Sequence, residues 1–316
     1  MLSQVSGSNI AVEVVNLTKY YGDLLAVDHI NFEVSKGEVF GFLGPNGAGK
    51  TTTARILTGI IKADEGNVTV MGYPAGSLQA KQMAGVVPEL ANAYIDLSAW
   101  NNLMLMIELY GVARADGKRR AETLLKELGL YERKDDLVKR FSRGMKQRLL
   151  LCMAMISAPE ILFLDEPTSG LDVQSTRLIR GILRNLKQER KTIFLTTHDM
   201  AEANELCDRV AIINHGKIVA IDDPEKLRIT VNRLHSVVVG FDKPVAAEVL
   251  VELPTVNRVE KVGDSLRLYT DNPCSVVASI VDYSRTNNLT MVNLQVLSPS
   301  LEDTFVKLTE EGPRGN

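Results

Sequence analysis

The sequence predicts an α/β core domain followed by a smaller α+β domain, and three observations carry this prediction. Short apolar runs alternate with helical patterns over most of the first 225 residues, which favours a mostly parallel sheet flanked by helices. A glycine-rich segment, residues 44–49, separates one apolar run from a helical pattern. Beyond about residue 233 the order becomes strand, helix, strand, strand, helix, strand, which is typical of a ferredoxin-like domain.

In the core domain, β-branched and apolar runs indicate strands and 3.6-residue periodicity indicates helices. A long helical region is expected between residues 76 and 132, and Gly129 stands where a left-handed residue often ends a helix. The expected strands cover residues 10–17, 29–34, 39–43, 67–70, 161–164, 191–196, 209–214 and 217–221. The expected helices cover residues 50–57, 118–128, 144–156, 173–189 and 200–207.

A domain boundary is expected near residues 222–233, which gives a core domain over residues 10–225 and an accessory domain over residues 230–312. In the accessory domain we expect strands at residues 235–241, 256–262, 266–270 and 290–297, with helices at residues 245–253, 274–286 and 300–309.

Composition and charge argue against several classes of protein. The chain has 316 residues, is 45% hydrophobic and has a formal net charge of −3. It lacks the general basic field that draws proteins to nucleic acid, so no nucleic-acid partner is expected. Cys152, Cys207 and Cys274 are few and far apart, which favours a reducing cytosol over a disulfide framework. No apolar run approaches the length of about 20 residues that a membrane helix needs.

The glycine-rich segment carries the strongest chemical signal. It fits the pattern G-x-x-x-x-G-K-[ST], in which glycines let successive backbone N–H groups face phosphate oxygens. The helix that begins near Lys50 adds the positive end of its dipole. Lys50 can reach the β- and γ-phosphates, and the Thr51 hydroxyl can ligate Mg²⁺. The predicted ATP-binding residues here are Gly44, Pro45, Asn46, Gly47, Ala48, Gly49, Lys50, Thr51 and Thr52.

Two carboxylates follow the buried strand of residues 161–164. In a parallel sheet, ligands bind beyond the carboxyl ends of the strands. Asp165 is therefore expected to hold Mg²⁺, directly or through water. Glu166 is expected to polarise the water that attacks the γ-phosphorus. Acidic pairs are common at solvated strand ends, and the phosphate-binding loop is what favours the catalytic interpretation.

His198 stands at the end of another apolar run, residues 192–197. It could hydrogen-bond the γ-phosphate and position the attacking water, although a single histidine is more often structural. The remaining histidines lack such a setting and are interpreted as structural; they are His29, His215 and His235.

With these motifs in place, residues 11–225 resemble the nucleotide-binding domain of the ATP-binding cassette (ABC) superfamily. Residues 141–148 resemble its signature sequence, residues 169–172 its D-loop, and His198 its switch histidine. The resemblance implies a P-loop NTPase core with a helical subdomain and a β-subdomain. It also implies that Tyr21 stacks on adenine, a contact worth about 1 kcal/mol. The implied signature and D-loop residues are Ser142, Arg143, Gly144, Met145 and Asp172.

Members of this family work as head-to-tail pairs, with each ATP held between the loop of one domain and the signature of the other. The resemblance therefore implies a homodimer or a pair with a paralogous subunit. It also implies an integral membrane partner, and a location in the cytoplasm on the cytoplasmic face of the membrane. In transporters of this family, the helical subdomain contacts the membrane subunit. Apolar residues that either serve that contact or pack the subdomain are Tyr94, Leu97, Trp100, Leu103, Met104 and Met106.

Two positions depart from the usual family pattern. Arg143 replaces a glycine of the signature, and it either turns to solvent or brings a guanidinium near phosphate. Glu89 replaces a glutamine and could still ligate Mg²⁺. Both departures, and residues 297–305 near the C-terminus, resemble a subfamily of prokaryotic exporter ATPases that carry a C-terminal extension.

Three functional hypotheses follow. The first is the ATPase subunit of a membrane exporter, which couples hydrolysis of ATP to ADP and phosphate to transport. The second is a soluble ABC-family switch on ribosomes or DNA. Relatives of that kind usually carry two cassettes, coiled coils or zinc modules, and this sequence shows none of these patterns. The third, a binding-only pseudo-ATPase, is disfavoured by the presence of Lys50, Asp165, Glu166 and His198.

Overall fold

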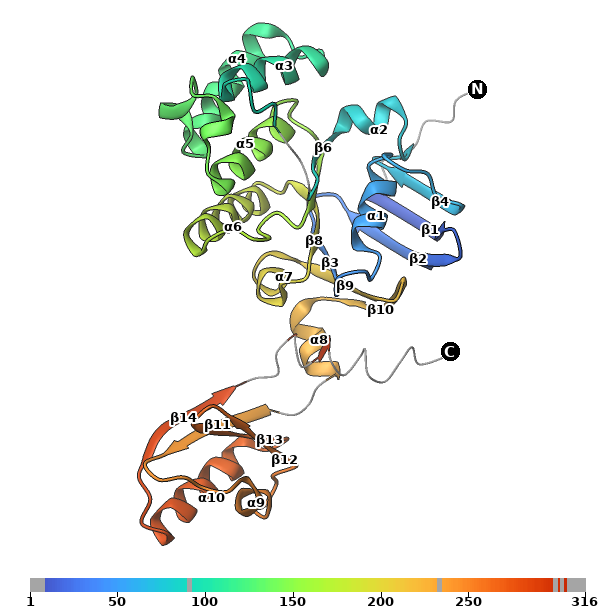
Figure 1. The fold of residues 1–316 in the computed structure, drawn as a ribbon. Helices are drawn as coiled ribbons and strands as arrows, with labels where there is room; N and C mark the ends of the chain where they lie inside the picture. The colour runs from blue at the N-terminus through green and yellow to red at the C-terminus, as the bar shows by residue number, and fades with distance from the viewer. Residues whose placement is uncertain (1–8, 90–92, 232–234, 298–300, 302–303, 306–316) are drawn as a thin grey trace. The chain divides into compact units, whose positions relative to one another are not determined.

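The computed structural model describes residues 9–89, 93–231, 235–297, 301 and 304–305. The chain divides into two compact units, residues 1–224 and 225–316. The first unit contains two sheets and the second unit one, and each unit has its own hydrophobic core (Figure 1). The terminal helix that the sequence predicts at residues 300–309 lies largely outside the described residues.

A six-stranded sheet forms the centre of the first unit, in the order β10-β9-β3-β8-β7-β6. The strands from β9 to β6 run parallel, and β10 pairs antiparallel with β9 as the second strand of a hairpin. The predicted mostly parallel sheet is therefore confirmed. Its strands are β3 (Val39–Leu43), β6 (Ala84–Val87), β7 (Ile161–Asp165), β8 (Thr192–Thr197), β9 (Arg209–Asn214) and β10 (Lys217–Asp222).

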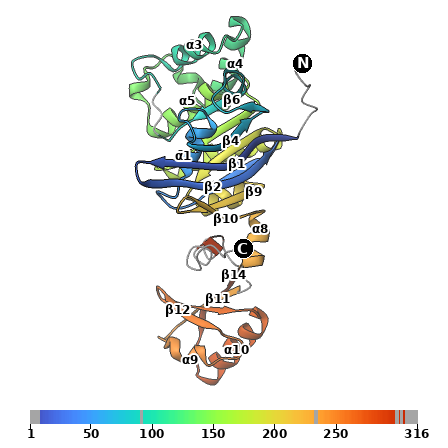
Figure 2. The ribbon, with the colours of Figure 1, turned by 90° about the vertical axis from the view of Figure 1, so that its right-hand side faces the viewer.

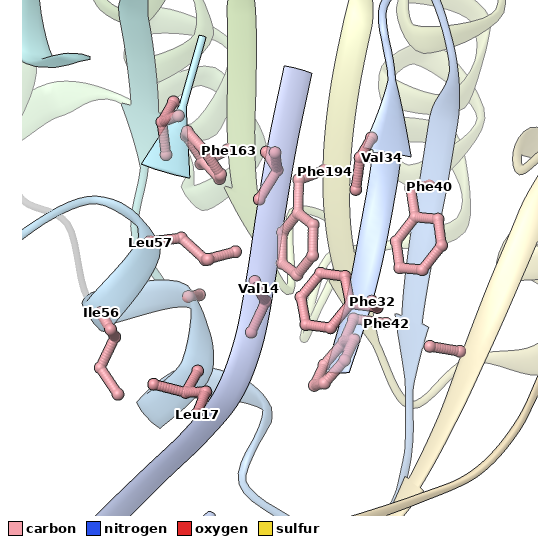
Figure 3. Packing of buried hydrophobic residues seen from close by; sticks show 14 of the residues in the cluster. Val14, Leu17, Phe32, Val34, Phe40, Phe42, Ile56, Leu57, Phe163 and Phe194 are labelled. Carbon is pink, nitrogen blue, oxygen red and sulfur yellow. The ribbon is translucent and has the colours of Figure 1, made fainter. Parts of the chain in front are cut away.

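A second, antiparallel sheet of the first unit has the order β2-β1-β4-β5 (Figure 2). Phenylalanines connect it to the central sheet: the ring of Phe32 on β2 lies 5.5 Å from Phe40 and from Phe42 on β3 (Figure 3). Phe194 and Phe163 extend the same aromatic cluster, which fixes β3, β7 and β8 below the site described next. The strands are β1 (Ile10–Tyr21), β2 (Leu24–Ser35), β4 (Glu65–Val70) and β5 (Tyr73–Pro74).

The helices of the first unit start and stop where local sequence signals place them. Ser98, Ser142 and Asp172 cap the N-termini of three helices with side-chain oxygens. Gly129 follows α4 with a φ of 63°, as its predicted role in ending that helix requires. The helices are α1 (Lys50–Leu57), α2 (Leu78–Met83), α3 (Ala99–Leu109), α4 (Arg114–Glu127), α5 (Arg143–Met155), α6 (Val173–Gln188) and α7 (Met200–Leu206), with single 3₁₀ turns at Tyr131–Arg133 and Val138–Arg140.

The prediction of a purely helical region from residue 76 to residue 132 is wrong at β6. Residues 84–87 pair in parallel with β7 and complete the edge of the central sheet. A Cβ on Gly85 would lie 2.3 Å from the Ala154 carbonyl oxygen, so only glycine lets β6 approach α5 this closely. The four-residue run is too short for its periodicity to show, and pairing with a distant strand decides its conformation.

The second unit contains a four-stranded antiparallel sheet with the order β12-β13-β11-β14. Two helices lie on one side of it, and the chain order of strand, helix, strand, strand, helix, strand is that of a ferredoxin-like domain (Figure 1). Helix α8 precedes this sheet. The elements are α8 (Pro224–Val231), β11 (His235–Phe241), α9 (Ala247–Val251), β12 (Arg258–Val262), β13 (Ser265–Thr270), α10 (Pro273–Thr286) and β14 (Met291–Leu297).

We propose that residues 10–225 fold without the accessory domain, because the two hydrophobic cores share no residue. A chain ending at residue 230 is expected to stay folded and to bind ATP, with a single cooperative unfolding transition. Circular dichroism and nucleotide binding measured beside the full chain check this. A truncated chain that is unfolded, while the full chain folds under the same conditions, would show that the boundary is misplaced.

Candidate active site

The phosphate-binding loop lies between the end of β3 and the start of α1. Gly47 and Gly49 have φ values of 80° and 109°, in the region that favours glycine. A Cβ on Gly49 would lie 2.7 Å from the Ala26 carbonyl oxygen, and one on Gly44 would lie 2.4 Å from that of Ile213. No side chain caps the N-terminus of α1, so its first backbone N–H groups are available to an anion.

Lys50 extends along the inside of this loop and is almost fully buried. Its ammonium donates to the Gly44 carbonyl at 2.8 Å and to the Pro45 carbonyl at 3.2 Å. It also lies 3.2 Å from Oε1 of Glu166. The loop therefore presents one compact positive charge, already oriented, next to the first residue beyond β7.

Asp165 ends β7 with its carboxylate between two hydroxyl groups. Thr196 Oγ1 donates a short hydrogen bond to Asp165 Oδ1, and Thr51 Oγ1 lies 3.4 Å from the same atom. Burial raises the pKa of Asp165, and the hydrogen bonds from these threonines offset part of that rise. A nearby divalent cation would favour the charged carboxylate, so the Thr51 and Asp165 oxygens fit Mg²⁺.

Glu166 has a left-handed backbone, with a φ of 51°. Such a conformation costs about 1–3 kcal/mol in a non-glycine residue and is found most often at functional sites. Its N–H donates to both the carbonyl and the hydroxyl oxygen of Thr196, which holds the residue in place. This conformation directs the carboxylate toward Lys50 on one side and toward His198 on the other.

His198 follows β8, the neighbouring strand of the sheet. Its Nδ1 lies 2.5 Å from Oε2 of Glu166, and half of the imidazole surface remains exposed. The structure thus joins Lys50, Glu166 and His198, which are distant in sequence, into one continuous polar row.

A buried glutamate supports the two loops that carry Glu166 and His198, and sequence reasoning did not select it. Glu202 on α7 is fully buried and accepts a 2.8 Å hydrogen bond from Thr168 Oγ1. Burial raises its pKa. The backbone N–H of Glu202 donates to the Asp199 side chain, which caps α7. From sequence alone, Glu202 is recognisable only as part of this helix cap.

A pocket of about 500 Å³ opens over the phosphate-binding loop. The exposed ring of Tyr21 lines it, as do Glu89 and Glu166. His215, interpreted from sequence as structural, also lines this pocket from the β9–β10 turn, which is far from the loop in sequence. The full lining is Tyr21, Leu24, Leu25, Ala26, Asn46, Gly47, Gly49, Lys50, Thr51, Thr52, Glu89, Glu166, His215 and Gly216.

The expected signature residues lie at the start of α5. Ser142 caps this helix by accepting a hydrogen bond from the Met145 N–H at 3.2 Å. The Arg143 guanidinium is exposed and donates to the Ser169 carbonyl at 2.8 Å. The Arg143 side chain is thus solvent-exposed and hydrogen-bonded to the D-loop of its own chain.

The D-loop residue Asp172 caps α6 and accepts hydrogen bonds from the N–H and the hydroxyl of Ser175, at 2.7 and 3.0 Å. These bonds lower the pKa of Asp172. Gly144 packs against the same serine. A Cβ at this position would lie 2.1 Å from Ser175 Oγ, so the contact requires glycine. Ser175 therefore contacts both the D-loop residue Asp172 and the signature residue Gly144 of the same chain.

An apolar groove of about 570 Å³ lies between α1, α2 and α3 of the first unit. Leu78 and Leu109, on its wall, are 70% and 67% exposed. Of the helical residues selected from sequence, Met106 lines the groove, Tyr94 is exposed, and Leu103 is fully buried in the core. The remaining three are half-buried, namely Leu97, Trp100 and Met104.

Across the described parts of both units, no helix has the length and apolar character needed to cross a membrane. No group of three or more His, Cys, Asp or Glu side chains among those same residues could hold a metal ion. An Mg²⁺ ion that keeps water molecules and phosphate oxygens as ligands needs no such group.

The fold and the loop define a P-loop nucleoside triphosphatase. Residues 27–169 match the family described as ABC transporter. The linearmycin resistance ATP-binding protein LnrL of Bacillus subtilis is 35% identical over 310 residues, which are 94% of this chain and 98% of LnrL. The Nod factor export ATP-binding protein I of Rhizobium sp. is 38% identical over 306 residues, which are 96% and 98% of the two chains.

Solved structures agree with these relatives. One described as the ATP-binding subunit of an ABC transporter superposes with a TM-score of 0.64 and 28% identity, covering 70% of this chain and 92% of its own. CbiO1 of Clostridium perfringens, part of the ABC transporter complex cbiONQ, superposes with a TM-score of 0.62 and 26% identity. The match covers 70% of this chain and 91% of CbiO1. This chain belongs to the ABC transporter ATP-binding proteins. It is an ATPase coupled to transport, and subunits of this kind dimerise and work with membrane subunits.

Proposed function

We propose that this chain is the ATP-hydrolysing subunit of an exporter and drives a separate membrane subunit through ATP-dependent dimerisation. The observation that carries the proposal is the position of Glu166, held between the Lys50 ammonium and the His198 imidazole at the mouth of the phosphate-binding loop. Relatives named for resistance and for export match nearly the whole chain, including the accessory domain.

In this proposal the amides of residues 44–52 and the Lys50 ammonium bind the phosphates, and Tyr21 stacks on adenine. Thr51 and Asp165 would hold Mg²⁺, and Glu89, which lines the same pocket as Thr51, could contribute a further oxygen. The ion would neutralise charge on the phosphate oxygens. The short hydrogen bond from Thr196 fixes the carboxylate of Asp165 in the required direction.

The hydrolytic step is assigned to Glu166, whose carboxylate accepts a proton from the attacking water. The Nδ1 of His198 lies 2.5 Å from that carboxylate, which leaves Nε2 as the ring nitrogen for the γ-phosphate contact. The left-handed backbone at Glu166 is part of the geometry that holds the carboxylate in this position.

The second half of each ATP site is assigned to the signature of a partner cassette, with Ser142, Gly144 and Met145 at the N-terminus of α5. The partner is a second copy of this chain or a paralogous subunit. Because Arg143 binds the D-loop carbonyl of Ser169, contact with the partner's ATP is transmitted to α6 within the same chain.

The membrane subunit is proposed to insert an apolar helix into the groove of α1, α2 and α3, on the cytoplasmic face.

The groove assignment predicts that Leu78→Glu and Leu109→Glu uncouple the ATPase from its membrane subunit. Both side chains are exposed, so the fold and the basal ATPase rate are expected to persist. Burial of a leucine contributes about 1.5–3 kcal/mol, so each substitution should weaken binding to the membrane subunit roughly 10- to 100-fold. Val249→Glu, on exposed α9, is the matched control. Unchanged co-purification of both variants with the membrane subunit would exclude the groove.

The direction of transport is tested with the same complex in inside-out vesicles that expose the ATPase to added Mg·ATP. An exporter is expected to accumulate its substrate inside these vesicles, and the leucine variants are expected to lose that accumulation. ATP-driven release of preloaded substrate from the vesicles would identify an importer. ATPase activity without any membrane partner or transport would favour a soluble switch instead.

A further inference from the structure

One buried carboxylate of the first unit takes no part in the hydrolytic step assigned above. Glu202 on α7 is fully buried and does not line the nucleotide pocket. Burial raises the pKa of its carboxyl, and the neighbouring hydroxyls of Thr197 and Thr168 offset part of that rise. Burying a carboxylate costs free energy unless the group is paired and hydrogen-bonded. The contacts of Glu202 therefore indicate why this position carries a charged side chain.

Glu202 contacts the turn that begins at Glu166. Thr168, two residues beyond Glu166, is buried and donates a 2.8 Å hydrogen bond from its Oγ1 to Oε1 of Glu202. The Ser169 N–H closes the turn by donating to the Glu166 carbonyl at 3.1 Å. The side chain of Glu202 thus fixes the backbone immediately beyond the residue that has the left-handed conformation.

Glu202 also contacts the segment that carries His198. Its backbone N–H donates to Oδ1 of Asp199 at 2.9 Å, and Asp199 directly follows His198. The Asp199 N–H donates in turn to the hydroxyl of Thr197, on the other side of His198. Arg180 on α6 donates to Oδ2 of Asp199 at 2.5 Å, which holds the same carboxylate from a second helix. One residue of α7 therefore connects the two segments whose side chains meet in the site.

The pairing of the Glu202 carboxylate is incomplete. Among the described residues, its Oε2 is buried without a hydrogen-bond partner, and so is Nε of Arg180, which lies 3.9 Å from Oε1. A buried ion pair in this condition adds little to folding stability, and apolar side chains of similar size often replace such a pair without loss. Stability alone therefore does not account for Glu202. The hydrogen bond from Thr168 is the contact that an apolar residue would lack.

We propose that Glu202 is a positioning residue for ATP hydrolysis, because it keeps the Glu166 carboxylate at hydrogen-bond distance from the His198 imidazole. This role rests on the proposed assignment of Glu166 as the base, and the connection runs through the Thr168 hydroxyl. The contact that it maintains is short, 2.5 Å between Nδ1 and Oε2. A displacement of roughly 1 Å in an active site can lower the rate about 10²-fold. The phosphate-binding residues, 44–52, belong to a different loop, so kcat should fall without a change in KM for ATP.

Glu202→Met tests this role in the full-length chain, because methionine has a similar size and cannot accept the hydrogen bond from Thr168. Steady-state hydrolysis is expected to show a kcat lowered about 10- to 10²-fold, with KM for ATP within about 2-fold of wild type. Thermal unfolding should stay close to wild type. Glu202→Gln keeps an acceptor oxygen for the threonine and should retain most of the wild-type kcat. Wild-type kcat in Glu202→Met, or equal losses in the methionine and glutamine variants, would overturn the proposal.

Glu205→Met is the matched control. Glu205 lies on the same helix and contacts the same guanidinium, that of Arg180, at 3.4 Å, but its side chain is exposed. This variant should keep the wild-type kcat. A loss as large as that of Glu202→Met would show that any change in the charge of α7 has the same effect, and the positioning role would be rejected.

The other partner of the hydrogen bond provides an independent measurement. Thr168→Val keeps the shape of the side chain and removes the donor, so it should lower kcat as Glu202→Met does. Thr168→Ser restores a hydroxyl and should regain most of the activity. The double variant Thr168→Val, Glu202→Met should lose no more than the weaker of the two single variants, since both remove one contact. Additive losses would contradict the proposal. Where Glu202→Met does not fold, equal kcat in Thr168→Val and Thr168→Ser would overturn it.

Glu166→Gln, measured beside these variants, separates the positioning role from the proposed function. Slow hydrolysis in Glu166→Gln together with wild-type kcat in Glu202→Met rejects the positioning role alone. Wild-type hydrolysis in Glu166→Gln overturns both, because Glu202 is proposed to act through Glu166.

Discussion

Glu166→Gln is expected to slow ATP hydrolysis by about 10²–10⁴-fold while ATP binding persists, which is the usual size of a general-base contribution. Glutamine keeps the shape of the side chain and can keep a contact with Lys50, but it cannot accept a proton from water. ATP should then remain bound between two cassettes, so the variant should accumulate as an ATP-bound dimer. Single-turnover hydrolysis and size-exclusion chromatography with Mg·ATP measure the two effects.

Glu160→Gln is the matched control for this experiment, because Glu160 is exposed and directly precedes the same strand, β7. It should leave turnover unchanged. If Glu166→Gln hydrolyses ATP at the wild-type rate, Glu166 is not the base, and the row of Lys50, Glu166 and His198 would have another purpose.

Lys50→Ala is expected to abolish tight ATP binding. Each hydrogen bond to a charged group contributes about 1.5–3 kcal/mol, so losing contacts to two phosphates should weaken binding roughly 10²- to 10⁴-fold. Titration with a fluorescent ATP analogue measures this loss. Lys62→Ala, at an exposed position near the end of α1, controls for the change in net charge. Wild-type affinity in Lys50→Ala would rule out the assignment of the loop.

The same substitution also leaves the buried Glu166 carboxylate without its cationic neighbour, and an uncompensated buried charge is destabilising by about 3–5 kcal/mol. The double variant Lys50→Ala, Glu166→Gln removes that charge and should regain thermal stability without regaining ATP affinity. This comparison separates loss of binding from loss of folding.

Much of the site could be predicted because its parts are short and local. A glycine-rich loop before a helix, or a carboxylate at the end of an apolar strand, is visible within about ten residues, and backbone sterics allow few other conformations there. The topology of the accessory sheet could also be anticipated from the order of its elements. The departure at Arg143 was visible as well, although its hydrogen bond to Ser169 was not.

Features that depend on long-range contacts were missed. Strand β6 exists because β7, more than 70 residues later, pairs with it. Glu202 reaches Thr168 and His215 reaches the pocket only because the parallel sheet places their loops together. Such pairings cannot be predicted from local patterns, because the composition and periodicity of each segment do not indicate its distant partner.

The sequence by itself determined the phosphate-binding loop and the alternation of strands and helices. Each of these follows from backbone freedom or side-chain type over a few adjacent positions. Only the tertiary structure decided that Glu166 adopts a left-handed backbone between Lys50 and His198. The reason is physical: distances between side chains on different strands are set by packing of the whole sheet, which no local segment contains.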